Sequence, residues 1–186
     1  LDISDRSIEV AQKQASEIGL DAEFVCSDVY SAKEHINKKF DIVFTSYGTI
    51  GWLPDMDKWA DIVAHFIKPG GQFVFAEFHP VVWMFDYDFE KVEFRYFNSK
   101  PIIEFNEGTY ADREADIALE EIGWNHSLGE VITALLVQGL TLNSFKEYDY
   151  STANCFNGLK KIAEDKYIVE KHGNKLPLIY SLLMTK

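Results

Sequence analysis

The feature that most constrains how this chain can fold is the alternation of helical and strand-like segments along it. Residues 5–18 place apolar side chains at three- and four-residue steps, between a capping Ser4 and a terminating Gly19, which predicts a helix. "AEFVCSD" (22–28) and "KFDIVFTSYG" (39–48) are predicted strands, and the second is rich in β-branched and aromatic residues. Strands that alternate with helices are typical of a mostly parallel sheet with helices on both faces.

The alternation continues through the rest of the chain. A helix is predicted from Asp55 to "KPGG" (68–71), where Pro69 stops it, and "GQFVFAEFHP" (71–80) then forms a strand. A later helix starts at a capping box made by Ser127 and Glu130. Two strands follow that helix, over "LTLNSFKEYDYS" (140–151) and "LPLIYSLLMTK" (176–186). The order predicts one α/β domain over residues 1–186.

Residues 81–124 differ from the rest of the chain because they are acidic and unusually rich in aromatic residues. Within them, "KVEFRYF" (91–97) and "PIIEFNEGTY" (101–110) are predicted to form two strands that pair across "NSK". We interpret 81–124 as an insertion within the domain, over the carboxyl end of the sheet. Its bulk fits a lid over a small molecule with an apolar part. A structural cap and a dimer contact are the alternatives, so a homodimer stays open.

The composition excludes several classes of partner and site. A formal net charge of -12 repels phosphate backbones and anionic lipid, so neither nucleic acid nor a membrane surface is expected as a main partner. Two cysteines in 186 residues are typical of a reduced cytoplasmic protein, and no apolar run is long enough to span a bilayer. The histidines and cysteines do not follow a metal-site spacing, so no metal is expected.

Two acidic residues end predicted strands, where α/β sheets bind their ligands. Asp2 could accept hydrogen bonds from both ribose hydroxyls of an adenosine cofactor, or it could cap the helix that follows. Asp28 could accept from an adenine amino group while the N–H of Val29 meets a ring nitrogen, or it could form an Asx turn. Because one adenosine could touch both residues, the pair favours a cofactor site.

In order, these segments resemble the successive motifs of class I S-adenosylmethionine-dependent methyltransferases. The motifs are "LDIS" (1–4), "FVCSD" (24–28), "FDIVFTSYGTIGWLPD" (40–55), "IKPGG" (67–71) and "FVFAEFHP" (73–80). The two late strands resemble the antiparallel hairpin that ends this Rossmann-like fold. The resemblance implies S-adenosyl-L-methionine as cofactor and S-adenosyl-L-homocysteine as product.

The resemblance also implies a role for each residue that matches a family motif. Asp2 would bind the ribose and Ile3 would pack on the adenine, while Asp28 and Val29 would meet the adenine edge. The methionine part of the cofactor would be lined by Thr45, Ser46 and Tyr47. The rings of Tyr47 and Trp52 could attract the methyl sulfonium, although loop packing is the alternative for Trp52.

The chain departs from the family at its start, because the family's first strand and its glycine-rich loop have no counterpart. That strand lies at the centre of the family's sheet, and leaving its neighbours unpaired would cost about 1–3 kcal/mol for each buried backbone group. We therefore expect a further segment of roughly 40–60 residues before Leu1. Without it, the chain is expected to bind its cofactor poorly.

Two histidines are candidates for a base that removes a proton from the methyl acceptor. His79 follows the strand "FVFAEF" and faces the expected crevice, unless it is a turn residue bonded to backbone. His126 precedes a helix N-terminus, which disfavours an imidazolium, unless it is a simple polar residue before a cap. The leading interpretation is a cytoplasmic methyltransferase for a small-molecule acceptor. A non-catalytic cofactor-binding protein and a Rossmann dinucleotide oxidoreductase are the alternatives.

Overall fold

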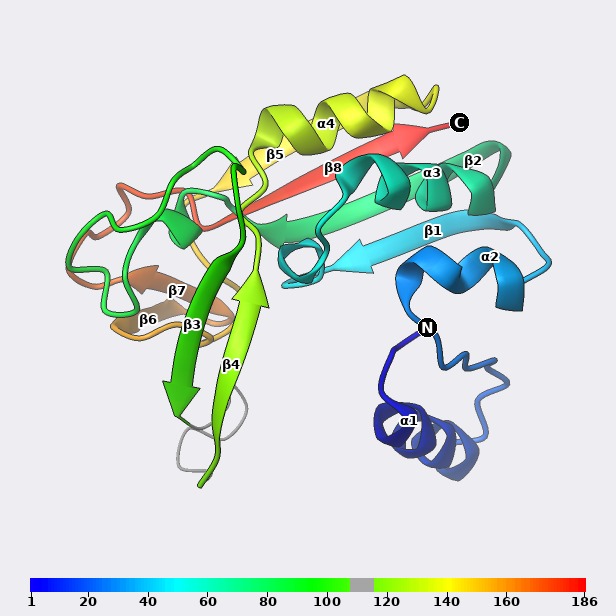
Figure 1. Ribbon diagram of the computed structural model, residues 1–186, viewed down its shortest axis with the longest axis horizontal. Helices are drawn as coiled ribbons and strands as arrows, with labels where there is room; N and C mark the ends of the chain where they lie inside the picture. Colours follow the sequence, from blue (N-terminus) through cyan, green and yellow to red (C-terminus); the bar gives the residue numbers. More distant parts are fainter. Residues whose placement is uncertain (108–115) are drawn as a thin grey trace.

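The computed structural model describes residues 1–107 and 116–186, and its centre is a four-stranded sheet (Figure 1). The strands lie in the order β1–β2–β8–β5. Their bounds are β1 (Phe40–Ser46), β2 (Ile67–Phe78), β5 (Thr141–Tyr148) and β8 (Ile179–Thr185). The sheet therefore confirms the predicted α/β class and brings the strand that comes latest in the chain between β2 and β5.

Parallel and antiparallel pairing meet at β2. This strand is parallel to β1, with Thr45 opposite Phe75, and antiparallel to β8, with Glu77 opposite Tyr180. β5 and β8 are antiparallel too, as expected for the end of the fold. Beyond β1 and β2, parallel pairing in the described chain is a single bridge between Asp2 and Cys26. The prediction of a mostly parallel sheet was therefore wrong, because the predicted strand over 22–28 shrinks to that bridge.

The helices begin at the polar residues that the sequence offers as caps. The α-helices are α1 (Asp5–Glu17), α2 (Ala32–His35), α3 (Met56–Phe66) and α4 (Leu128–Val137), and the 3-10 turns are η1 (Val29–Ser31), η2 (Ile50–Trp52) and η3 (Val82–Met84). The side chains of Ser4, Asp55 and Ser127 each accept a hydrogen bond from the N–H three residues later. Such caps satisfy backbone donors that a helix leaves unpaired at its start.

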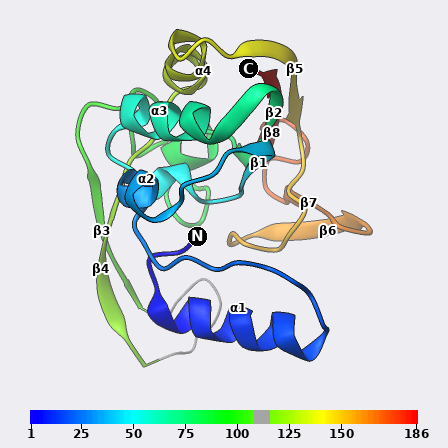
Figure 2. The same ribbon diagram turned by 90° about the vertical axis from the view of Figure 1, so that its right-hand side faces the viewer.

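One face of the sheet is covered by α3 and α4, which lie side by side (Figure 1). Trp59 of α3 packs on Phe73 and Phe75 of β2, with ring centroids 5.8 and 5.4 Å apart. The opposite face of β1 leaves Ile42 59% and Phe44 61% exposed. Helices were expected on both faces, but α1 lies beyond α2, away from that surface (Figures 1 and 2).

Residues 81–124, the predicted insertion, contain a hairpin of β3 (Ile102–Glu107) and β4 (Ala118–Gly123), which projects from the sheet (Figure 1). The predicted pairing of 91–97 with 101–110 was wrong, because β3 pairs with β4 instead. Tyr110 lies outside the described residues, as do its neighbours in 108–115.

A second hairpin, formed by β6 (Leu159–Ala163) and β7 (Lys166–Val169), was not predicted from the sequence. Its turn contains Asp165 with a φ of 51°, a conformation that glycine adopts more easily. The sequence has no glycine there to indicate the turn. Among the described residues, no helix is both long enough and apolar enough to cross a membrane.

Candidate functional site

The carboxyl ends of β1 and β2 lie at the same end of the sheet, where α3 and α4 also begin (Figure 1). Strand ends supply side chains there, and the helix starts supply unpaired N–H groups. Open α/β sheets bind ligands at this end, beyond the carboxyl ends of their strands. The predicted site residues can therefore be followed from strand to strand along it.

Asp2 lies beside the segment that leads to Asp28. The N–H of Asp2 donates to the carbonyl of Val25 at 3.1 Å, and the N–H of Ser27 donates to the carbonyl of Asp2 at 2.9 Å. The exposed carboxylate of Asp2 accepts the N–H of Ser4 at 2.8 Å. This contact lies just before α1, whose N-cap is Ser4, and the exposed carboxylate of Asp2 remains accessible to a ligand. Ile3 is 75% exposed beside it.

Asp28 also has a local partner, because its Oδ1 accepts the N–H of Ser31 at 3.1 Å. Hydrogen bonding by Ser31, first through its side chain and then through its backbone, lowers the pKa of Asp28. The carboxylate is therefore ionised at neutral pH. The side chain of Val29 packs into the core against α3, so its backbone is the part of Val29 that could meet a ligand.

Thr45 and Ser46 end β1, and Tyr47 begins the loop that leads to η2. The Tyr47 ring is 42% exposed and lies 5.8 Å from the Phe78 ring at the end of β2. Gly48 has a φ of 74°, a backbone conformation that residues with a Cβ rarely adopt. The loop thus turns sharply at Gly48 and presents the Tyr47 ring to the outside.

Glu77 lies under this loop and is 2% exposed. Its carboxylate accepts N–H groups from Gly48, Thr49 at 2.9 Å and Ile50 at 3.2 Å, as well as that of Phe78 at 2.7 Å. Burial raises the pKa of Glu77, against the lowering effect of these donors. The sequence contained a signal, because Glu77 continues the buried alternation of Phe73 and Phe75.

His79 is buried and both of its ring nitrogens have partners. The N–H of Val81 donates to Nδ1 at 3.1 Å, so Nδ1 is an acceptor and the hydrogen of the neutral ring is on Nε2. Nε2 in turn donates to Glu147 at 2.9 Å. Burial lowers the pKa of His79, while Glu147 raises it less. His79 thus joins the end of β2 to β5.

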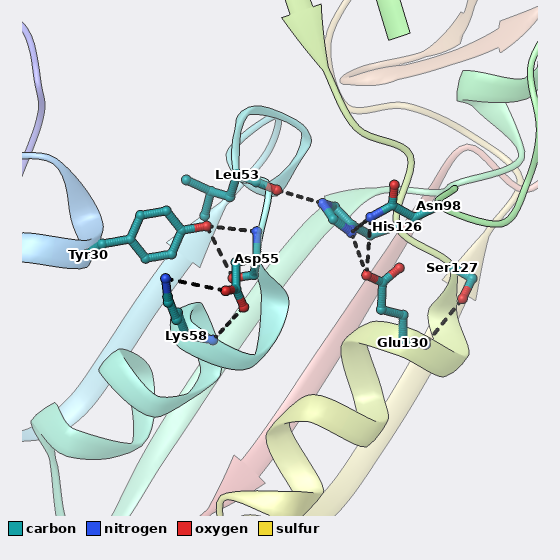
Figure 3. A network of polar contacts seen from close by, with 8 residues as sticks. All are labelled: Tyr30, Leu53, Asp55, Lys58, Asn98, His126, Ser127 and Glu130. Carbon is teal, nitrogen blue, oxygen red and sulfur yellow. Dashed lines mark hydrogen bonds and ion pairs between the residues drawn. The ribbon is translucent and has the colours of Figure 1, made fainter. Parts of the chain in front are cut away.

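His126 joins three segments at the start of α4 (Figure 3). Its fully buried ring donates through Nε2 to the carbonyl of Leu53 at 2.8 Å, because a carbonyl oxygen only accepts. Nδ1 lies 3.0 Å from Glu130 Oε1, and the Asn98 side-chain amide lies 3.4 Å from both atoms. Glu130 was predicted to return to the Ser127 backbone, but its carboxylate is turned to His126 instead. The four-residue spacing of His126 and Glu130 was the available signal for this pair.

A cavity of about 580 Å³ opens between the starts of α3 and α4, on the Glu130 side of this network. Its lining comprises Tyr30, Pro54, Asp55, Met56, Asp57, Lys58 and Glu130. The Tyr30 hydroxyl donates to the carbonyl of Asp55 at 3.1 Å and accepts its N–H at 3.0 Å (Figure 3). This volume is in the range of small-molecule pockets, and three of its lining side chains are carboxylates.

The two histidines belong to neighbouring segments with separate networks. The side chain of Asn125, next to His126, donates to the carbonyl of Pro80, next to His79, at 3.0 Å. Among residues 1–107 and 116–186, the side chains form no group of three or more that could hold a metal ion. The exposed strand-end residues and the buried contact between His126 and Glu130 are thus separate parts of this end of the sheet.

Residues 1–71 match the model of a family described as a methyltransferase domain. No match was found among curated proteins.

Solved structures similar to the chain include several methyltransferases. A S-adenosylmethionine-dependent methyltransferase from Clostridium acetobutylicum is 16% identical over 98% of this chain and 72% of its own, with a TM-score of 0.60. A SAM-dependent methyltransferase from Methanosarcina mazei is 17% identical over 100% of this chain and 79% of its own, with a TM-score of 0.62. The N-methyltransferase NodS from Bradyrhizobium japonicum, in complex with S-adenosyl-L-homocysteine, is 13% identical over 100% of this chain and 64% of its own, with a TM-score of 0.51. The chain thus has the fold of the class I S-adenosylmethionine-dependent methyltransferases, and its residues 1–71 match the methyltransferase-domain family.

Proposed function

We propose that this chain transfers a methyl group from S-adenosyl-L-methionine to a small-molecule acceptor. The observation that carries the proposal is the pairing of Asp2 with Cys26, which puts two accessible, acidic strand ends next to each other in a chain with a methyltransferase fold. When bound, the cofactor supplies an electrophilic methyl group on a sulfonium and leaves as S-adenosyl-L-homocysteine. A solved neighbour of the same fold is a glycopeptide N-methyltransferase complexed with S-adenosyl-L-methionine.

The strand-end residues fit such a cofactor. In this proposal the exposed Asp2 carboxylate accepts the ribose hydroxyls, and the exposed Ile3 side chain covers one face of the adenine. Asp28 is ionised and can accept from the adenine amino group, beside the backbone of Val29. The methionine part lies against Thr45, Ser46 and Tyr47, and the exposed Tyr47 ring attracts the sulfonium charge.

The His126–Glu130 pair is the proposed proton acceptor. Without an extra proton, Nδ1 and Oε1 are two acceptors 3.0 Å apart, and the Asn98 amide is the donor near both. A proton that arrives between them converts this unfavourable contact into a charge-assisted hydrogen bond. Glu130 lines the cavity, so it can take the proton from an acceptor bound there, with His126 behind it.

His79 has a different proposed part. Both nitrogens of its neutral ring are engaged, so neither has a lone pair available without a rearrangement. We therefore assign it to positioning: it holds the end of β2 against Glu147. The predicted base role for His79 is replaced in this proposal by the His126–Glu130 pair.

The acceptor is proposed to be small because the cavity is of ligand size and because the net charge of -12 disfavours nucleic acid. A cytoplasmic location, based on the presence of only two cysteines in 186 residues, stays a proposal as well.

Calorimetry of the full-length protein with S-adenosyl-L-methionine and S-adenosyl-L-homocysteine tests the proposal. We expect both to bind and mass spectrometry to detect a methylated product in a panel of small amines, alcohols and thiols. Absence of binding by either ligand would exclude the proposed function. Binding with no product across the panel would favour a non-catalytic cofactor-binding protein, and binding of a nicotinamide dinucleotide instead would favour an oxidoreductase.

A further inference from the structure

Glu77 is a buried acid that the proposed reaction does not use. It is 2% exposed, and its neighbours on the covered face of the sheet are aromatic: Phe75 precedes it on that face and Tyr180 lies opposite it on β8. Removing a carboxylate from water is costly unless its oxygens are fully hydrogen-bonded. A side chain retained in such surroundings needs partners that an apolar residue could not provide.

Those partners are successive backbone amides of one loop. The Glu77 carboxylate accepts the N–H groups of Gly48, Thr49 and Ile50, while the Thr49 hydroxyl donates to the carbonyl of Ser46. Three consecutive N–H groups converge on an anion only when the backbone curls around it, and the φ of 74° at Gly48 makes that curl possible. The carboxylate therefore determines the path of the loop.

The same loop carries Tyr47 and is tied to Ser46, two of the residues assigned above to the methionine part of the cofactor. Tyr47 directly precedes the three bound amides, and its ring packs on Phe78, the neighbour of Glu77, at 5.8 Å. Ser46 is tied to the loop through the Thr49 hydroxyl. A displacement of Gly48 would thus be transmitted to both Ser46 and Tyr47.

We propose that Glu77 is a positioning residue whose buried carboxylate holds the Tyr47–Ile50 loop in the conformation that binds the methionine part of the cofactor. This inference rests on the proposed function for the identity of the ligand. The hydrogen bonds between Glu77 and the loop do not depend on which ligand binds. Two measurements can therefore test the role of Glu77 and the identity of the ligand separately.

The first measurement is hydrogen exchange of the loop amides in the full-length protein without ligand. Glu77→Gln replaces one acceptor oxygen by an NH₂ group that faces backbone donors, so the amides of Gly48, Thr49 and Ile50 should exchange at least tenfold faster. Phe73→Leu is the matched control, because Phe73 is buried on the same face of β2 and touches none of these amides. It should lower stability but leave loop exchange within about twofold of the parent. Unchanged exchange in Glu77→Gln would overturn the proposal.

The second measurement is the affinity for S-adenosyl-L-methionine and for S-adenosyl-L-homocysteine. A misplaced loop in Glu77→Gln should lower the affinity for both ligands by at least tenfold. In Phe73→Leu the affinity for each ligand should fall by less than twofold. A loss confined to S-adenosyl-L-methionine, which alone carries the sulfonium charge, would overturn the proposal in favour of a simple charge effect. If the parent protein binds neither ligand, the proposed function fails, and the exchange measurement still decides whether Glu77 holds the loop.

A second pair of variants guards against a Glu77 variant that does not fold. Thr49→Pro removes one of the bound N–H groups at a residue whose φ of -87° a proline can approach, and Thr49→Ala keeps that N–H but lacks the hydroxyl. We expect Thr49→Pro to lower the affinity for both ligands at least fivefold more than Thr49→Ala does. Equal affinities in the two variants would contradict the proposed hold of Glu77 on the loop.

Discussion

At the scale of single residues, Asp2 offers a direct test of cofactor binding. Asp2→Ala in the full-length protein should weaken the binding of S-adenosyl-L-methionine by about 1.5–3 kcal/mol, the range for a hydrogen bond to a charged group. Ser4→Ala is the control, because the Ser4 hydroxyl caps α1 without reaching the exposed side of Asp2. It should cost stability of about 1 kcal/mol and leave affinity unchanged. Calorimetry that finds equal affinities for Asp2→Ala and the parent would leave Asp2 only its local contact with the N–H of Ser4.

The His126–Glu130 pair predicts a loss of rate without a loss of cofactor affinity. Glu130→Gln removes the carboxylate that shares the proton and should lower methyl transfer by roughly 10²–10⁴-fold. Ser127→Ala is the matched control, since it removes the cap of α4 and leaves the pair in place. Turnover under saturating cofactor separates the two variants, and a Glu130→Gln enzyme with parental turnover would exclude the pair as base.

His79 predicts how stability depends on pH. Because burial lowers its pKa from the ordinary value of 6.5, the unfolded chain takes up a proton at a higher pH than the folded chain does. The stability that His79 contributes is complete above about pH 6.5 and is lost as the pH falls through its folded pKa. Urea unfolding between pH 7.5 and 5 should show this decline, and His79→Gln should flatten it. His65→Gln is the control, since the pKa of His65 is lowered too, by burial first. A slope that only His65→Gln removes would assign the decline to His65.

At the scale of elements, the start of α3 is fixed by Asp55, whose Oδ1 accepts the N–H of Lys58 at 3.0 Å. Asp55→Ala should lower the free energy of unfolding by about 1 kcal/mol, within the range of about 0.5–2 for lost caps. Asp55→Asn keeps an acceptor at the same place and should remain within about 0.5 kcal/mol of the parent. Denaturant titration measures both changes, and similar losses in the two variants would point to the charge instead of the cap.

The helices and the main strands could be predicted because their signals are local. Ser4, Asp55 and Ser127 cap the helices that the sequence assigned to them. Strand pairing is not local. For this reason "KVEFRYF" was predicted as the partner of β3, whereas β3 pairs with β4. The same limit applies to the site: strand-end acids such as Asp2 could be found from position, whereas the partners of Glu77 come from a loop 27–29 residues away.

At the scale of the whole molecule, β1 forms one edge of the sheet, with Ile42 and Phe44 exposed beside that edge. The outer side of β1 has no neighbouring strand in the four-stranded sheet, whereas β8 is paired on both sides. We therefore expect the amides of Phe40–Ser46 to exchange their hydrogens faster than those of Ile179–Thr185. Equal exchange in β1 and β8 would contradict the prediction.

The place of β8 has a consequence for synthesis on the ribosome. β8 lies between β2 and β5, yet it follows both in the chain. Until β8 leaves the ribosome, β5 lacks its neighbour in the described sheet and one side of β2 is open, so the nascent chain exposes unpaired edges on both strands. The four-stranded sheet can therefore be completed only after β8 has been translated. The nascent chain depends during that interval on being kept from edge-to-edge association.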